Sequence, residues 1–406
     1  MRTRTRPADL RVPLDYRTLP IETPSFVIDR ALLRRNMKLL ADIQARADCT
    51  ILLAMKGFAT WPFFDEMAPY LGGVAASSTY EARLARETFG GGEIHAYCPA
   101  YTAEEVRELT ELADHVVFNS FRQWETHRDT LARAERPIQA GLRVNPEYSE
   151  VRVEIYNPCT IRSRFGIRIS DFDGRDLDGI SGLHFHTMCQ QGADVLARTL
   201  GQVEELFGDY FPRLTWINFG GGHHITRPGY DIDLLCETIR DFRRRTGLTV
   251  YLEPGEAHVM NTGFLVTQVL DIIENPHSAD IAIVDASAAA HMPDVMEMPY
   301  TPEVWHGRVF YDDHFEAPLD EFPHKYLLGG KTCLSGDLIG EYGFDRELHV
   351  GDRLVLTDMA QYTLVKTTMF NGIRHPSIVS ADADIPGGDV RVIREFDYED
   401  YKRRLG

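Results

Sequence analysis

Lys56, His186, Gly220–Gly222 and Glu253 are residues that could do chemistry, and each lies at the end of a short, largely apolar segment. A lysine amine can bond to an aldehyde, and glycine backbone amides can approach a phosphate closely. An imidazole can stack on an aromatic ring, and a carboxylate can keep a ring nitrogen protonated. Together these groups indicate pyridoxal 5′-phosphate (PLP), a cofactor with an aldehyde, a phosphate and a pyridine ring.

Lys56 and Glu253 carry most of this argument. Apolar surroundings lower the pKa of a lysine, which makes a neutral amine at Lys56 available to bond with the PLP aldehyde. A carboxylate at Glu253 would hold the proton on the pyridine nitrogen and strengthen the ring as an electron sink. Decarboxylation at the α-carbon of an amino acid needs such a sink, whereas a racemase can work with a weaker one. Glu253 therefore favours a decarboxylase over a racemase.

Each feature also has a purely structural explanation. Lys56 could be a buried lysine paired with an acid, Gly220–Gly222 could be a tight turn, and His186 could be a core histidine. The shared position of all of them at segment ends favours the chemical interpretation.

The proposed chemistry requires elements that bring these segment ends together. Eight β-type segments alternate with amphipathic helix-like stretches, which predicts a (β/α)8 barrel over residues 30–262. Such barrels hold their active sites at the carboxyl ends of the strands. A doubly wound open sheet is the alternative, but it would need a GxGxxG motif after its first strand, and the chain has none there. The expected strands are Thr50–Met55, Gly73–Ala76, Glu93–Cys98, His115–Asn119, Gln139–Val144, Ile180–His186, Leu214–Phe219 and Thr249–Glu253.

A second, β-rich domain is expected outside the barrel. Residues 263–406 contain β-type segments joined by long loops with Pro and Gly, without regular helix alternation. Thr23–Ile28 is a further β-type segment that precedes the barrel. We therefore expect residues 1–29 and 263–406 to form one sandwich-like or barrel-like β-domain. Its expected strands include Gly263–Ile272, Asp280–Val284, Arg308–Phe310, Arg353–Leu356 and Val390–Ile393.

Composition excludes several other functions. The 406 residues carry 43 Lys and Arg against 61 Asp and Glu, a net charge of −18, which disfavours nucleic-acid binding. No run of 18 apolar residues exists, and the basic N-terminus lacks the apolar run of a secretory signal. The six cysteines form no closely spaced pairs, so no metal site or disulfide framework is indicated. We expect a cytoplasmic protein that binds a small molecule.

Beyond these features, the chain resembles the PLP-dependent decarboxylases of the alanine-racemase fold (fold type III). The resemblance extends from about Thr23 to Gly372. Within that family it is most similar to the branch that decarboxylates carboxynorspermidine and carboxyspermidine. The segments that carry the resemblance are Leu53–Ala59, Gly182–Gln190, Asn218–His223, Glu253–Ala257, His291–Tyr300 and Gly329–Gly340.

The resemblance implies roles for individual residues of the cofactor site. Lys56 would bind PLP covalently, His186 would stack on the ring, and Glu253 would face the pyridine nitrogen. Gly221 and Gly222 would line the phosphate, and Tyr362 would reach it from elsewhere in the chain.

The resemblance also implies a homodimer with shared active sites. Cys333 would enter the site of the other subunit and donate the proton to the α-carbon after CO2 leaves. Asp337 would bind the distal amine of the substrate. Without the resemblance, Cys333 would read as a small apolar residue.

Departures from the diaminopimelate decarboxylases favour a cationic substrate arm. Those enzymes carry an arginine where this chain has Glu256 and a glutamate where it has Leu334. Glu256 would attract a polyamine arm and repel a distal carboxylate. Asp294, Glu297 and the acidic loop 312–321 are further candidate acids, although a solvated surface loop is the alternative for them.

The expected reaction is therefore the decarboxylation of carboxynorspermidine or carboxyspermidine to norspermidine or spermidine. Two alternatives stay open. The first is the same chemistry on diaminopimelate, ornithine or an unusual cationic amino acid. The second is a catalytically silent PLP-binding homologue, which would commonly have lost the lysine, the acid or the cysteine that this chain keeps.

Overall fold

The computed structural model describes residues 14–406 except 299, 306, 310, 313–314 and 317–321. The chain divides into two compact units, one of residues 34–258 and one formed by the remaining residues at both ends. The division falls four residues inside each boundary expected for the barrel, and at the first of them α1 (Arg30–Ala47) begins in one unit and continues into the other. Most of the acidic loop 312–321 lies outside the described residues.

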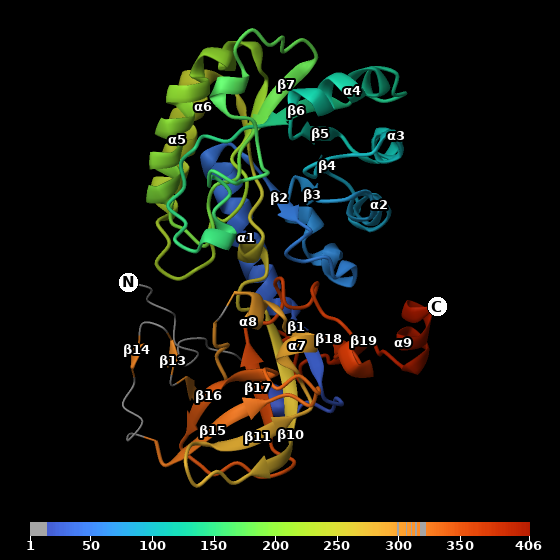
Figure 1. Ribbon diagram of the computed structural model, residues 1–406, viewed down its shortest axis with the longest axis vertical. Coiled ribbons are helices and arrows are strands. Elements are labelled where there is room, and N and C mark those ends of the chain that lie inside the picture. The colour runs from blue at the N-terminus through green and yellow to red at the C-terminus, as the bar shows by residue number, and fades with distance from the viewer. Residues whose placement is uncertain (1–13, 299, 306, 310, 313–314, 317–321) are drawn as a thin grey trace. The chain divides into compact units, whose positions relative to one another are not determined.

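The first unit is a closed barrel of eight parallel strands, which confirms the expected fold class (Figure 1). Each strand lies within two residues of its expected segment. The barrel strands are β2 (Thr50–Ala54), β3 (Gly73–Ala76), β4 (Glu93–Tyr97), β5 (His115–Phe118), β6 (Gln139–Arg143), β7 (Ile180–His184), β8 (Trp216–Asn218) and β9 (Thr249–Leu252).

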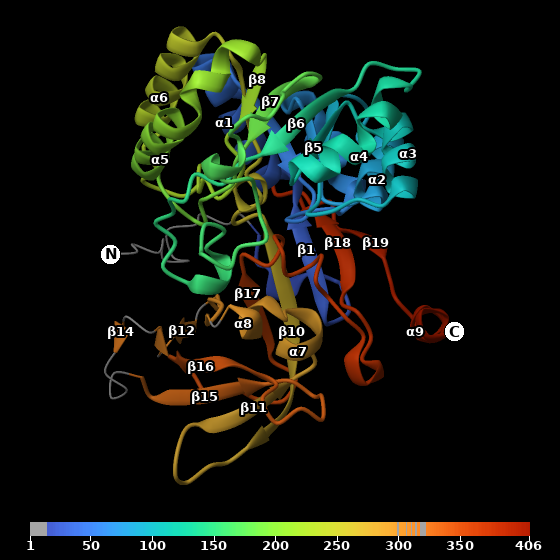
Figure 2. The ribbon, with the colours of Figure 1, turned by 45° about the horizontal axis from the view of Figure 1, so that its top comes forward.

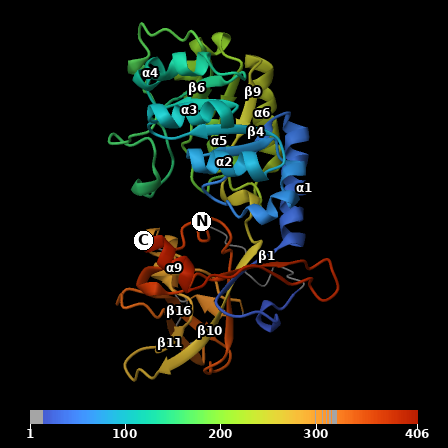
Figure 3. The same ribbon diagram turned by 90° about the vertical axis from the view of Figure 1, so that its right-hand side faces the viewer.

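Helices cover the outside of this barrel, and α2, α3 and α4 follow one another around it (Figure 3). Two connections carry only 3-10 turns. The segment between β2 and β3 contains Pro62 and Pro69, which cannot donate the backbone hydrogen bonds of an α-helix, and the segment between β6 and β7 is equally irregular. The other helices of this unit are α2 (Thr79–Thr88), α3 (Ala103–Leu112), α4 (Phe121–Ala132), α5 (Ala193–Phe207) and α6 (Ile232–Thr246).

Trp216, the first residue of β8, packs inside the barrel. Its indole ring lies so close to β6 and β7 that a Cβ atom at Gly141 or Gly182 would come within 2.4 or 2.0 Å of it. Leu52, Val117 and Tyr251 pack in the same cluster. Truncating a buried Trp to Ala typically costs about 3–5 kcal/mol, so this packing is a substantial part of the barrel's stability.

The second unit is built on a nine-stranded sheet, part of which Figure 2 shows. The N-terminal strand β1 (Ser25–Asp29) lies between β10, to which it is antiparallel, and β18, to which it is parallel. This confirms that the N-terminal segment joins the β-domain. Along the sheet the order is β12 (Gly307–Val309), β16 (Leu338–Phe344), β15 (His324–Gly329), β11 (Asp280–Val284), β10 (Gly263–Ile273), β1, β18 (Ser377–Ala381) and β19 (Arg391–Arg394), with β17 (Arg353–Thr357) also paired to β10.

Several elements of this unit were not expected from the sequence. Strands β15, β16 and β18 alternate too weakly or contain too many glycines to stand out as strands. The short helices α7 (Ala288–His291) and α8 (Asp294–Glu297), the C-terminal α9 (Tyr398–Leu405) and the short pair β13 (Tyr311–Asp312) and β14 (Phe315–Glu316) were also missed. Among the described residues, none of the helices combines the length and the apolar character needed to cross a membrane.

Candidate active site

Three neighbouring barrel strands direct polar side chains to one point at their carboxyl ends. Glu253 follows β9, and its Oε2 lies 3.2 Å from Nε2 of His184 at the end of β7. Asn218 ends β8, between these two strands, and donates from Nδ2 to Glu253 Oε1 at 2.6 Å. Both carboxylate oxygens of Glu253 are therefore held by neighbouring strands.

The environment of Glu253 keeps its carboxylate ionised. Burial by itself would raise the pKa of Glu253, but His184 first, and then His95 and Lys56, outweigh burial and lower it to about 2. A carboxylate that stays negative in a nearly closed site can hold a proton on a nearby ring nitrogen. This is the property required of a group that faces a pyridine.

The ring of His186 is fixed by the glycine turn that was predicted to bind phosphate. The backbone N–H of Gly221 donates to Nδ1 of His186 at 2.8 Å. Burial, and then the positive charges of Lys56 and Arg143, lower the pKa of His186 well below its usual range. His186 is therefore a neutral imidazole in a defined orientation, as a ring-stacking residue would be.

The glycine turn is built for close backbone approach. A Cβ atom at Gly221 would lie 2.3 Å from the carbonyl oxygen of Glu253, and one at Gly222 would lie 2.0 Å from that of Met188. Gly222 also has a φ of 85°, which side chains rarely tolerate. The turn therefore packs bare backbone against that of Glu253 and Met188, beside His186, and a glycine turn of this kind can approach a phosphate closely.

Lys56 follows β2 and is accessible to solvent, yet barrel residues surround it. Desolvation lowers its pKa, Arg143 lowers it further, and Glu253 opposes the shift. The Lys56 side chain can therefore be reached by solvent although the surrounding protein lowers its pKa. The lowered pKa favours the neutral amine that bonds with an aldehyde.

Arg143 is a site residue that the sequence analysis missed. It ends β6 and is buried, and its guanidinium lies over the rings of Tyr97 and Phe165 at 4.6 and 4.5 Å. Its Nη2 donates to the carbonyl oxygen of His186 at 3.4 Å. An arginine at the end of a strand whose other neighbours are apolar was the signal that could have identified it.

Glu256 belongs to the same barrel unit. Its carboxylate accepts from Gln190 Nε2 at 3.1 Å, and its Oε2 lies 2.6 Å from His224 Nε2. Gln190 and His224 were also not singled out from the sequence. His224 follows the glycine turn by two residues, and Gln191, next to Gln190, donates its N–H to the carbonyl oxygen of Gly222 at 2.9 Å, so Glu256 is held next to this turn.

Asp294 and Glu297 lie on α8 of the sheet unit, and they differ in how they are paired. Asp294 Oδ2 accepts from Tyr300 at 2.7 Å and from Thr363 at 3.0 Å, while its buried Oδ1 has no hydrogen-bond partner in the described structure. Glu297 forms an ion pair with Lys366. Tyr362, the residue before Thr363, adopts a φ of 47° in the same loop.

Cys333 and Asp337 lie in the loop between β15 and β16. Cys333 is exposed, and its backbone N–H donates to Asn371 Oδ1 at 2.7 Å. Asp337 is buried, 3% exposed, and its carboxylate is surrounded by donors of its own unit. The barrel residues and these sheet-unit residues thus form two groups, one in each unit.

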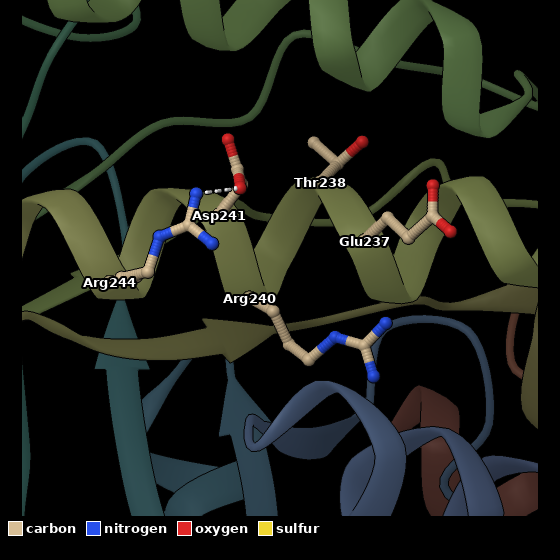
Figure 4. Close-up of a pocket in the computed structure, with 5 residues that line it drawn as sticks. All are labelled: Glu237, Thr238, Arg240, Asp241 and Arg244. Atoms are coloured by element: carbon tan, nitrogen blue, oxygen red, sulfur yellow. Dashed lines mark hydrogen bonds and ion pairs between the residues drawn. The ribbon is translucent and has the colours of Figure 1, made fainter.

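One further cluster and one surface hollow lie apart from these groups. Glu93, His95 and His115, near the amino ends of β4 and β5, have the composition of a metal site. In the structure the two imidazoles stack at 3.8 Å and 11°, and His95 Nε2 lies 3.1 Å from Glu93 Oε2. The hollow on α6 is lined by none of the expected site residues, and Asp241 and Arg244 within it pair with each other (Figure 4).

The barrel residues fit PLP. An ionised Glu253, a neutral and oriented His186, a bare glycine turn and a lysine with lowered pKa match the pyridine nitrogen, ring, phosphate and aldehyde of that cofactor. The fit rests on the chemistry of these groups together, because each alone also occurs as a structural feature.

Comparison with known proteins gives the same result. A family model described as "Pyridoxal-dependent decarboxylase, C-terminal sheet domain" matches residues 25–360. The chain is 43% identical to the carboxyaminopropylagmatine decarboxylase of Synechocystis sp., over 95% of this chain and 96% of that one. It is also 43% identical to the carboxynorspermidine/carboxyspermidine decarboxylase of Campylobacter jejuni, over 95% of this chain and 98% of that one.

A solved structure extends the similarity to three dimensions. The carboxynorspermidine decarboxylase of Campylobacter jejuni, crystallised with norspermidine, superimposes with a TM-score of 0.87 at 42% identity. The superposition covers 95% of this chain and all of that one. Sequence, fold and site chemistry therefore agree that this chain belongs to the pyridoxal-dependent decarboxylases and is a PLP-dependent carboxy-lyase.

Proposed function

We propose that the enzyme decarboxylates a carboxylated polyamine: carboxynorspermidine, carboxyspermidine or the related carboxyaminopropylagmatine. The observation that carries this proposal is the 43% identity, over nearly the whole length, to two decarboxylases named for such substrates. All these substrates join an amino-acid head to a cationic arm. The net charge of −18 and the acidic side chains of the candidate site suit such an arm.

The barrel residues would hold the cofactor and control protons around it. When bound, PLP supplies the electron sink for the carbanion that CO2 leaves behind. Lys56 would bind the cofactor through its neutral amine and release it to the amine of the substrate. Glu253 would keep the pyridine nitrogen protonated, His186 would stack on the ring, and the turn of Gly221 and Gly222 would line the phosphate.

The sheet-unit residues would complete the site. Tyr362 would reach the phosphate, and Cys333 of the neighbouring subunit in a homodimer would donate the proton to the α-carbon. Cys333 is exposed, which supports this role, since a residue that donates a proton in the site of another subunit must lie at the surface of its own subunit.

Among the candidate substrate acids, Asp294 is the best placed to bind an ammonium group. Its buried Oδ1 has no hydrogen-bond partner among the residues that the structure describes, and burial raises the pKa of Asp294, a shift that a bound cation would reverse. Glu297 already pairs with Lys366, and Glu256 with Gln190 and His224, so their charges are partly compensated. A cytoplasmic location is part of the proposal, supported by six cysteines that are scattered along the sequence with no closely spaced pair.

The experiment is CO2 release by the PLP-loaded protein on the three carboxylated polyamines, meso-diaminopimelate and ornithine. Lys56→Ala serves as the inactive control. The expected result is turnover of one or more carboxylated polyamines and of neither diaminopimelate nor ornithine. The polyamine that is turned over fastest then shows which cationic arm the site accepts. Turnover of diaminopimelate or ornithine alone would overturn the assigned substrate class while leaving the PLP chemistry intact.

A further inference from the structure

We infer that Asp337 and Asn371 are positioning residues that hold the loop of Cys333, and that Asp337 is not the group that binds the distal amine. The inference rests on the proposed function, because it concerns the proton donor of that reaction. It differs from the role that family resemblance implies for Asp337. The contacts within the sheet unit carry it.

The Asp337 carboxylate is already saturated with hydrogen bonds. Ser287 Oγ lies 3.0 and 2.9 Å from its two oxygens, and the backbone N–H of Ala289 donates at 3.1 Å. Thr332 donates from both its backbone N–H, at 3.1 Å, and its hydroxyl, at 2.7 Å. A carboxylate has about four lone-pair sites, so an ammonium group would have to displace one of these donors.

Asp337 also closes the loop that carries Cys333. The N–H of Gly330 donates to the carbonyl oxygen of Asp337 at 2.8 Å, and the N–H of Asp337 donates to that of Leu334 at 2.9 Å. A Cβ atom at Gly330 would lie 2.3 Å from Asp337 Oδ2, so the carboxylate packs against the backbone where the loop begins. Cys333 therefore stands at the exposed side of a loop closed around a buried carboxylate.

The same carboxylate ties this loop to a second functional segment. Ser287 is the N-cap of α7, where its Oγ accepts from the N–H of Ala290 at 3.0 Å while its hydroxyl donates to Asp337. Helix α8, which begins at Asp294, follows α7 closely in the chain. Asp337 thus fixes the Cys333 loop relative to the segment that carries Asp294.

Asn371 anchors Cys333 directly. Its Oδ1 accepts the backbone N–H of Cys333 at 2.7 Å, and its backbone has a φ of 57° and a ψ of 15°. Asn tolerates this left-handed conformation better than most residues, because its side chain can bond locally. Two successive backbone N–H groups of the loop are therefore held: that of Thr332 by Asp337, and that of Cys333 by Asn371.

The consequence concerns proton transfer. When Cys333 acts, its S–H bond breaks, a C–H bond forms at the α-carbon, and the thiolate keeps the electron pair until solvent reprotonates it. The rate of such a step depends steeply on distance, and a displacement of about 1 Å can cost about 100-fold. Residues that hold the Cys333 backbone should therefore affect kcat far more than substrate affinity.

The experiment compares Asp337→Asn, Asn371→Gly and Asn371→Asp with the wild type as PLP-loaded full-length protein. Asn371→Gly keeps the left-handed backbone but removes the acceptor, whereas Asn371→Asp keeps both. Asp29→Asn is the matched control, because Asp29 is a buried carboxylate of the same unit whose side-chain hydrogen bonds, among the described residues, come from Tyr16, Ala31, Leu32 and Ala383 and not from this loop. The readouts are kcat, KM and the rate at which iodoacetamide alkylates Cys333, measured by peptide mass.

We expect Asp337→Asn and Asn371→Gly to lower kcat about tenfold or more with KM changed less than about twofold. The alkylation rate of Cys333 should change in Asp337→Asn and in Asn371→Gly. Asn371→Asp, which keeps the acceptor, should have a kcat close to that of the wild type. A rise in KM with unchanged kcat in Asp337→Asn would instead identify Asp337 as an amine ligand and overturn the inference.

The experiment also distinguishes failure of the inference from unfolding of a variant and from failure of the proposed function. If Asp337→Asn unfolds, the Asn371 pair decides, and unchanged kcat and alkylation in Asn371→Gly would overturn the anchoring role. If the wild type turns over no carboxylated polyamine, the proposed function fails, whereas the alkylation rates still report whether these residues hold the loop.

Discussion

His184 and Glu253 meet at the mouth of the barrel, with the imidazole Nε2 3.2 Å from the carboxylate Oε2. They come from β7 and the end of β9, and Asn218 of the intervening β8 binds the other oxygen of Glu253 at 2.6 Å. Three consecutive strands therefore define the position and the charge of one carboxylate. Glu253, which is proposed to face the pyridine, is consequently held by the barrel strands although it follows the last residue of β9.

Replacing Glu253 by Gln tests the role of this charge. Gln keeps the shape and the hydrogen bond from Asn218 but cannot hold a proton on the pyridine nitrogen, so we expect kcat to fall about 10²–10³-fold. PLP should still bind, as measured by its absorbance. Glu237→Gln, an exposed position on α6, should leave both quantities unchanged. Wild-type kcat in Glu253→Gln would contradict the assignment.

Lys56→Ala should abolish covalent attachment of PLP. Borohydride reduction followed by mass spectrometry should find the cofactor on the Lys56 peptide of the wild type and on no peptide of the variant, with exposed Lys38→Ala as the control. Because the pKa of Lys56 is lowered, the attachment rate should reach its plateau at a pH below that of an ordinary lysine. Attachment at another lysine would refute this role.

Gly222→Ala should weaken cofactor binding and stability together. The new methyl group would meet the Met188 carbonyl at 2.0 Å in a backbone with a φ of 85°. We expect a loss of about 1–3 kcal/mol in unfolding free energy and a PLP affinity at least about tenfold weaker. Gly229→Ala has a similar φ of 76° but open space at its Cβ, so it separates backbone strain from the clash. Equal effects in both variants would attribute the loss to strain alone.

Asp294→Asn should raise KM for a carboxylated polyamine about tenfold and leave kcat nearly unchanged, because it removes a charge that binds the cationic arm. The amide oxygen can still accept from Tyr300 and Thr363, so the fold should be kept. Glu297→Gln should have a smaller effect, since Glu297 already pairs with Lys366. A larger rise in KM for Glu297→Gln than for Asp294→Asn would instead identify Glu297 as the residue that binds the cationic arm.

His115 should make stability depend on pH. Burial, and then His95, lower the pKa of His115 from 6.5 to about 3 in the folded protein. The unfolded state therefore binds the extra proton first, so this contribution is complete above pH 6.5 and is lost as the pH falls towards 3. We expect His115→Gln to lose less stability between pH 6.5 and 4 than the wild type, by an upper bound of about 3 kcal/mol.

Urea unfolding at several pH values measures this difference. His349→Gln is the control, since the His349 side chain is 69% exposed. Identical pH dependence in the wild type and in His115→Gln would contradict the lowered pKa of His115.

The barrel and the core of its site were predictable for a common physical reason. Parallel strands with both faces covered appear as short apolar runs, and the carboxyl ends of such strands converge. This patterning predicts that Lys56, His186, Gly221, Gly222 and Glu253 lie together at one end of the barrel. The sheet unit was harder to predict, because β15 and β16 contain glycines and the residues that join them form a closed loop.

The sequence by itself determined the fold class, the cofactor and the strand-end residues, since these depend on local patterning and on the order of elements along the chain. Only the tertiary structure decided how those residues are supported. Arg143 over Tyr97, Asn218 on Glu253, and Ser287 on Asp337 are pairs separated by 35 to 50 positions. A hydrogen bond or ring contact of that kind depends on where two distant segments meet in space, and no local pattern of residues encodes it.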